Sequence, residues 1–171
     1  MLPPSRRLIS VALITTLIGG LDGCLQVDNV SGPPPAQTDV DGTGTVVSIT
    51  DGDTLRLEVD GRELRVRLLG IDTPEVYPEI ECFGPEAELA LAALAPPGST
   101  LGFTYDRDPR DRFDRELMYL FTADGDLINL ELVTQGFAEA VLFEPNDRYW
   151  NELQAAERAA QRAGLGLWGS C

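Results

Sequence analysis

Two residue types that often carry chemistry in proteins are missing, because the 171 residues contain no histidine and no lysine. All 13 basic residues are arginine. Without an imidazole group, mechanisms that use a histidine base or a histidine-bound metal are excluded. Carboxylate chemistry remains, and its hard oxygen ligands favour calcium or magnesium over zinc.

Positive charge is also scarce, since 28 acidic and 13 basic residues give a formal net charge of −15. Proteins that bind nucleic acids are ordinarily basic, so this acidity argues against such a partner. In molar salt, however, the screening length falls to roughly 3 Å and repulsion from phosphates largely disappears. An acidic, lysine-free surface resembles those of extreme halophiles. The plain alternative is an acidic protein that avoids nucleic acid.

The N-terminal region has no apolar run long enough for a comfortable membrane span, because the run at 11–21 is short. A twin-arginine-like pattern at 5–10 precedes it, and Leu21-Asp22-Gly23-Cys24 resembles a lipobox, with Asp22 in place of the usual small residue. These patterns predict a signal peptide at 1–23 and a lipidated Cys24 that anchors an exported protein to the outer face of the cytoplasmic membrane, or a secreted protein. An uncleaved signal anchor is the alternative. Residues 24–42 read as a flexible linker and 43–171 as one domain.

Only three cysteines are present. If Cys24 carries lipid, Cys82 and Cys171 remain as an even pair in an exported protein, which suggests a disulfide. It would close a loop of about 90 residues. Two separate thiols are the alternative.

Short β-rich runs at 45–50, 54–59 and 64–69 are separated by Asp51-Gly52 and Asp60-Gly61, both strong hairpin signals. Further strands are expected at 100–105 and 116–121. Helices are expected from Gly84, at 128–134, and from 147 to about Gly164. The pattern predicts an α+β domain in which a five-stranded Greek-key barrel of the OB type carries about three helices.

Four charged residues form a chemically suggestive set: Asp53, Arg67, Asp72 and Glu75. In the third β-rich run alternate residues share a face, so Arg67 is expected to face away from the core and to be available to a ligand. Spaced carboxylates with an arginine are what metal-assisted attack on a phosphodiester requires. The plain alternatives are a hairpin turn at Asp53, a capped turn at 72–75, and an Arg67 paired with a surface glutamate.

Residues from about 43 to 168 resemble the staphylococcal nuclease (thermonuclease) family, here as an exported lipoprotein similar to those of halophilic archaea. The motifs that carry the resemblance are Asp51-Gly52-Asp53-Thr54, the segment 67–75 (RLLGIDTPE), Gly84-Pro85-Glu86-Ala87, the segment 111–115 (DRFDR), and Leu165-Gly166-Leu167-Trp168. Their order and spacing make the match specific.

The resemblance implies a Ca²⁺ ion held by Asp53, Asp72 and the carbonyl of Thr73. It implies that Glu75 positions or deprotonates the attacking water, and that Arg67 and Arg115 hold the phosphate. The expected activity is endonucleolytic hydrolysis of DNA and possibly RNA with little sequence preference.

Three positions depart from the family's usual pattern. Phe113 and Asp114 stand where a tyrosine and a glycine are common, and Phe143 remains as an aromatic platform where tyrosines often stack on a base. We expect Phe113 and Phe143 to contact the substrate, and Asp114 to place a negative charge and a side chain where glycine is more permissive. Two other functions stay open. One is a catalytically silent OB module that binds nucleic acid or protein at the cell surface, and the other is a calcium-stabilised surface protein.

Overall fold

The computed structural model describes residues 40–171. The expected signal peptide, Cys24 and nearly all of the expected linker lie outside these residues. Within residues 40–171, no helix is both long and apolar enough to cross a membrane.

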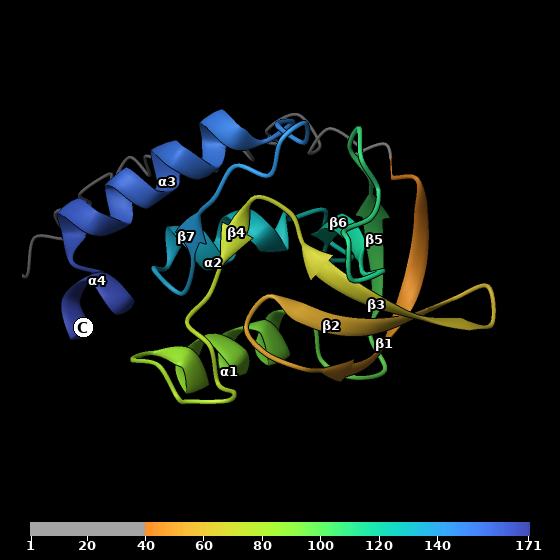
Figure 1. Ribbon diagram of the computed structural model, residues 1–171, viewed down its shortest axis with the longest axis horizontal. Helices are drawn as coiled ribbons and strands as arrows, with labels where there is room; N and C mark the ends of the chain where they lie inside the picture. The colour runs from red at the N-terminus through yellow and green to blue at the C-terminus, as the bar shows by residue number, and fades with distance from the viewer. Residues whose placement is uncertain (1–39) are drawn as a thin grey trace, which may run out of the picture. The chain divides into compact units, whose positions relative to one another are not determined.

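Five strands close into a barrel in the order β1-β2-β3-β6-β5, with β5 pairing back to β1 (Figure 1). All pairs are antiparallel except β3 with β6, which is parallel. This arrangement confirms the five-stranded OB-type barrel. The strands are β1 (Gly42–Ile49), β2 (Thr54–Val59), β3 (Arg62–Leu68), β5 (Thr100–Thr104) and β6 (Glu116–Phe121).

The three expected helices are present, and they pack together beside the barrel. α2 lies between α1 and α3 (Figure 1). A second, two-stranded sheet pairs β4 with β7. This small sheet and the last helical turn, α4, were not predicted from the sequence. The remaining elements are α1 (Gly84–Leu94), α2 (Ile128–Thr134), α3 (Trp150–Ala163), α4 (Leu167–Ser170), β4 (Ile71–Asp72) and β7 (Glu139–Ala140).

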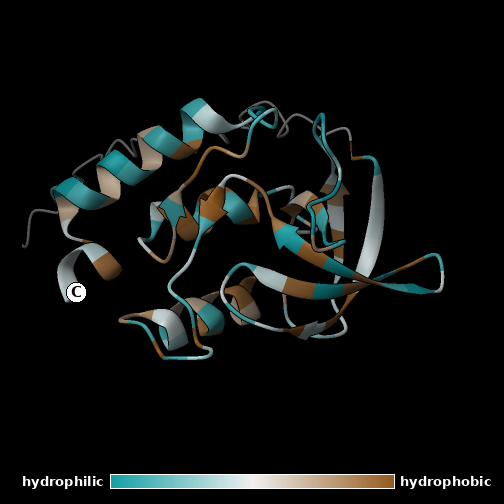
Figure 2. Cartoon of the chain, in the orientation of Figure 1, coloured by the Kyte–Doolittle hydropathy of each residue, from teal (hydrophilic) through white to brown (hydrophobic). Residues whose placement is uncertain are grey.

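Strand alternation explains how the barrel is filled. Leu55 and Leu57 are fully buried while Arg56 between them is exposed, as the two-residue period of a strand requires. The helices close the core with apolar faces: Leu153 and Ala160 of α3 are buried, and Figure 2 shows hydrophilic residues recurring along the same helix.

A glycine turn carries the chain from β3 to β4. Gly70 has φ +78°, and a Cβ atom there would lie 2.5 Å from Cδ1 of Leu153 in α3. A side chain at this position would therefore meet both backbone strain and a packed neighbour. The fully buried Asn129 of α2 fixes the same turn, since it donates to the carbonyl of Leu69 at 2.8 Å and accepts from the amide of Leu120 at 3.0 Å. The turn that follows Arg67 is thus held by two helices.

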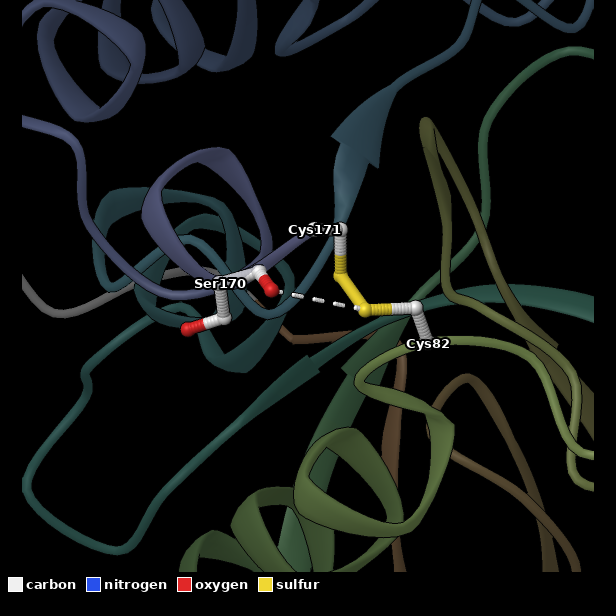
Figure 3. The surroundings of a disulfide bond; sticks show 3 residues. All are labelled: Cys82, Ser170 and Cys171. Atoms are coloured by element: carbon white, nitrogen blue, oxygen red, sulfur yellow. Dashed lines mark hydrogen bonds between the residues drawn. A yellow bond between two sulfur atoms is a disulfide. The ribbon is translucent and has the colours of Figure 1, made fainter.

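A disulfide joins Cys82, in the loop before α1, to Cys171, just after α4 (Figure 3). The two residues are 89 positions apart and their Cα atoms are 5.9 Å apart.

Candidate active site

Arg67 lies at the centre of the site and is almost fully buried, at 6% exposure. Its Nη1 is 2.7 Å from Oδ2 of Asp53, and its Nη2 is 2.5 Å from Oδ1 of Asp72. Nη1 also donates to the carbonyl of Ile71 at 2.9 Å. The expectation that Arg67 is available to a ligand is therefore corrected. The strand period puts its side chain outside the barrel core, but the chain at 71–72 returns over that face and covers it.

Asp53 is a buried carboxylate in the turn just before β2. Its Oδ2 accepts from the amide of Thr73 at 3.0 Å, and its Oδ1 accepts from the hydroxyl of Thr54 at 3.0 Å. Burial raises the pKa of Asp53 to about 7, although Arg67 acts in the opposite direction. The hairpin brings Asp53 to this point through Gly52, where a Cβ would lie 2.8 Å from Oγ1 of Thr73. The β1–β2 turn and the segment after β4 are thus in direct contact.

Asp72 and Thr73 complete the oxygen-rich part of the site. Asp72 pairs with Glu139 across the small sheet, and its side chain is 58% exposed, whereas Thr73 is buried. Among residues 40–171, no three His, Cys, Asp or Glu side chains are arranged to hold a metal ion. The carboxylates of Asp53 and Asp72, which both contact the Arg67 guanidinium, and the peptide carbonyl of Thr73 nevertheless form a set of hard oxygen donors. That chemistry fits calcium or magnesium.

Glu75 lies on the solvent side of this group. Burial and the nearby carboxylates of Asp51 and Asp72 raise its pKa. Its backbone amide donates to Oε2 of Glu81 at 3.0 Å, and its carbonyl accepts from the amide of Glu81 at 2.9 Å. Asp51 and Glu81 were not among the predicted site residues. Asp51 could have been found, because it belongs to the same Asp-Gly-Asp motif as Asp53, but no sequence pattern marks Glu81.

Arg115, the residue just before β6, is positioned by Asp111. Its Nε donates to Oδ2 of Asp111 at 2.7 Å, while the other carboxylate oxygen accepts from the amides of Phe113 and Arg115, each at 2.9 Å. Asp114 adopts a left-handed conformation with φ +60°, and its exposed side chain pairs with Arg110 at 3.2 Å. Aspartate is among the few residues with a side chain that tolerate this conformation, so the tight loop forms without the expected glycine.

A cleft of about 410 Å³ opens beside Arg115. Its lining combines arginines, carboxylates and two aromatic rings. The charged and aromatic residues that line it are Asp108, Arg110, Asp111, Arg112, Phe113, Arg115, Phe143 and Glu144. The guanidinium carbons of Arg112 and Arg115 lie 4.7 and 5.7 Å from the centre of the Phe113 ring. Arg112 was not among the predicted site residues.

Phe143 connects this cleft to the buried centre. It lines the cleft, and the guanidinium carbon of Arg67 lies 5.6 Å from the centre of its ring. Strand pairing gives the same neighbourhood, because Arg67 of β3 is in register with Leu117 of β6, two residues after Arg115. The structure therefore brings Asp53, Arg67, Asp72 and Thr73 into one group, with Glu75 at its edge and the cleft of Arg115, Phe113 and Phe143 beside it.

Comparison with known proteins gives a consistent answer. A family model described as "Staphylococcal nuclease homologue" matches residues 65–170. The thermonuclease of Staphylococcus intermedius is 34% identical over 148 residues, which cover 84% of this chain and 87% of that protein. The thermonuclease of Staphylococcus hyicus is 30% identical over 130 residues, 74% of this chain and 75% of that protein. Endonuclease YncB of Bacillus subtilis is 32% identical over 123 residues, 69% of this chain and 57% of that protein.

Proposed function

Since the chain belongs to the staphylococcal nuclease family and is a nuclease, we propose that it is a calcium-dependent endonuclease that hydrolyses DNA, with RNA as a second substrate, and has little sequence preference. The observation that carries the proposal is the contact of one buried arginine with two aspartates, beside Glu75 and the arginine-lined cleft. Resemblance to nucleases over most of the chain disfavours the silent OB module and the calcium-stabilised surface protein.

Asp53, Asp72 and the Thr73 carbonyl are the groups that would hold calcium. Bound there, the ion would supply charge neutralisation for a phosphate and a lower pKa for a water molecule. The other catalytic groups are side chains of the protein. Glu75, exposed beside Asp72, orients a water molecule and accepts its proton, which a carboxylate does well only when geometry holds it close.

Arg67 and Arg115 have complementary positions for holding a phosphate. Arg115 is one-quarter exposed and lies at the cleft, while Arg67 is buried against Phe143. The guanidinium of Arg115 can donate hydrogen bonds to the oxygens of a phosphate, and these bonds strengthen as charge develops in the transition state. Arg67, whose Nη atoms contact Asp53, Asp72 and the carbonyl of Ile71, would exchange some of these contacts for a phosphate oxygen. The rings of Phe113 and Phe143 offer faces for bases. Stacking on an aromatic face does not depend on which base is present, which agrees with low sequence preference.

The whole chain has a net charge of −15, and acidic residues are present in the cleft as well. There Asp108, Asp111 and Glu144 lie among three arginines. Such a mixed lining attracts phosphate weakly at low ionic strength, because the carboxylates repel it. Concentrated salt screens both interactions but leaves short contacts in the cleft in place. We propose that the nuclease works in a saline medium.

The test is a cleavage assay on the purified protein in about 2 M salt, a strongly screened medium. Duplex DNA, single-stranded DNA and RNA are each incubated with calcium, with magnesium, or with a calcium chelator. We expect cleavage with calcium and none with the chelator, and restoration when excess calcium is added back. Equal rates with magnesium would contradict the calcium assignment. A folded protein that cuts none of these substrates would contradict the proposed activity.

We also propose that the nuclease is exported and carries lipid on Cys24. The signal-like pattern at 5–24 and the pairing of the two remaining cysteines support this location. Cell fractionation tests it. Wild-type protein should sediment with membranes and Cys24→Ser protein should not, whereas equal membrane association of the two proteins would contradict lipidation.

A further inference from the structure

Both backbone groups of Glu75 are held by a single residue. The amide of Glu75 donates to the carboxylate of Glu81 at 3.0 Å, and the carbonyl of Glu75 accepts from the amide of Glu81 at 2.9 Å. Glu75 itself lies in a segment without helix or strand, between β4 and α1. Its position therefore depends on where Glu81 is held.

Glu81 is in turn linked to the start of α1. Its carbonyl accepts from the amide of Gly84 at 3.1 Å. A Cβ atom at Gly84 would lie only 2.6 Å from the carbonyl oxygen of Glu75, so the first residue of the helix packs directly on the backbone of Glu75. Glu75, Glu81 and Gly84 form one closely packed unit, which we call the Glu75 clamp.

The disulfide is attached to this clamp at the next residue, Cys82. Its other end, Cys171, follows α4, whose Leu167 donates its amide to the carbonyl of Gly136 at 2.9 Å. Phe83, on the other side of Cys82, stacks on Phe137 with 5.5 Å between ring centres. The clamp is therefore connected to the turn after α2 in two ways: by the disulfide to α4, which is hydrogen-bonded to Gly136, and by the stacking of Phe83 on Phe137. Figure 3 shows the covalent connection.

We propose that Glu81 and the Cys82–Cys171 disulfide position the catalytic Glu75, so that reduction of the disulfide lowers nuclease activity. The inference rests on the proposed role of Glu75. Cys82 is exposed, so a dithiol can reach it. Thiol–disulfide exchange would break the S–S bond, leave two protein thiols and convert the dithiol to its own disulfide, with two electrons and two protons transferred.

A disulfide that only strengthens the fold would behave differently. Its loss would lower the melting temperature but would leave the turnover of folded enzyme unchanged. A positioning role predicts lower kcat with little change in KM, because the groups proposed to hold phosphate lie outside the clamp. Displacement of a catalytic group by about 1 Å can cost a hundredfold in rate.

The experiment uses the full-length oxidised protein and four variants. Glu81→Ala removes the acceptor for the Glu75 amide, Glu81→Gln keeps an acceptor, the double variant Cys82→Ser/Cys171→Ser removes the cross-link, and Glu79→Ala changes an exposed residue of the same loop. We expect kcat to fall by about tenfold to a hundredfold in Glu81→Ala and in the double-serine variant. KM should stay within about twofold in both. Glu81→Gln and Glu79→Ala should resemble wild type.

A second measurement follows the backbone dynamics of the Glu75 clamp and does not depend on catalysis. Hydrogen exchange is followed in a peptide that covers residues 74–83, for wild type before and after treatment with a dithiol and for the Glu81 variants. We expect faster exchange in reduced wild type and in Glu81→Ala, and protection in Glu81→Gln. Because the dithiol arm needs no mutation, the question stays answerable if the double-serine variant does not fold.

The outcomes separate the two claims. If wild-type protein cleaves nucleic acid and Glu81→Ala and the double-serine variant share its kcat, or if Glu81→Ala and reduced wild type share its exchange rate, the clamp is overturned and the nuclease is left intact. Wild-type protein that cleaves nothing would overturn the proposed activity, and the positioning role with it. A loss of kcat in Glu81→Ala that Glu81→Gln repairs, together with faster exchange, supports the clamp.

Discussion

Arg67→Ala should destabilise the domain by about 3 kcal/mol and abolish cleavage. The substitution leaves Asp53, only 5% exposed, without the guanidinium that neutralises it at 2.7 Å. Removing one partner of a buried ion pair typically costs about 3–5 kcal/mol, because the remaining charge stays buried without compensation. The lower end applies here, since Asp53 keeps its hydrogen bonds from Thr54 and Thr73 and, with a pKa raised to about 7 by burial, can take up a proton once Arg67 is removed. Urea unfolding measures the first effect and the calcium-dependent assay the second.

Arg56→Ala is the matched control for this substitution. Arg56 pairs with a single carboxylate, that of Glu63, at 2.5 Å, and both side chains are nearly half exposed. Exposed pairs contribute about 0–1 kcal/mol. We therefore expect a loss of less than about 1 kcal/mol and unchanged cleavage. If the two arginine variants were equally stable, the buried group around Arg67 would not be the structural centre that its contacts indicate.

Glu75→Gln should lower kcat by about 10²–10⁴ without weakening the fold. Glutamine keeps the shape of the side chain but cannot accept a proton from water, and positioned proton transfer typically contributes a factor of this size. Glu75 is exposed, and its two hydrogen bonds to Glu81 come from the backbone and survive the change. The free energy of unfolding should therefore stay within about 0.5 kcal/mol of wild type. Single-turnover cleavage and urea unfolding check the two parts.

Glu79→Gln serves as the control, because it makes the same chemical change four residues away on an exposed part of the loop. It should cleave at the wild-type rate. A Glu75→Gln enzyme that retained most of its activity would remove Glu75 from the proposed mechanism, even if Arg67 and Arg115 proved essential.

The barrel could be predicted from the sequence because the residue patterns that specify its strands and turns are local and periodic. Leu55 and Leu57 alternate with Arg56, and Asp60-Gly61 terminates β2 with a turn signal that the structure contains as two residues of positive φ. The β4–β7 sheet could not be predicted in the same way. A pair such as Ile71 with Ala140 joins two-residue segments that are too short to show any period and lie far apart in the chain.

The structure brings the predicted residues Asp53, Arg67, Asp72 and Thr73 together, but the contacts among them could not be predicted. Strand alternation put Arg67 outside the core, yet its burial depends on the returning chain and on Phe143, which comes from a distant loop. The two hydrogen bonds between Glu75 and Glu81 depend on the conformation of residues 76–80 between them. No residue type or spacing specifies that closure, because loop conformation is set by the elements on either side.

The disulfide also divides the molecule into a covalent ring, which runs from residue 82 to residue 171, and a preceding segment. Asp53, Arg67, Asp72 and Glu75 precede the ring, whereas Arg115, Phe113 and Phe143 lie within it. A protease that cuts one exposed loop of the ring, such as that at 106–114, therefore leaves both fragments attached to each other. A singly nicked molecule would keep both halves of its site on one covalent framework, and only chemical reduction would let the pieces separate.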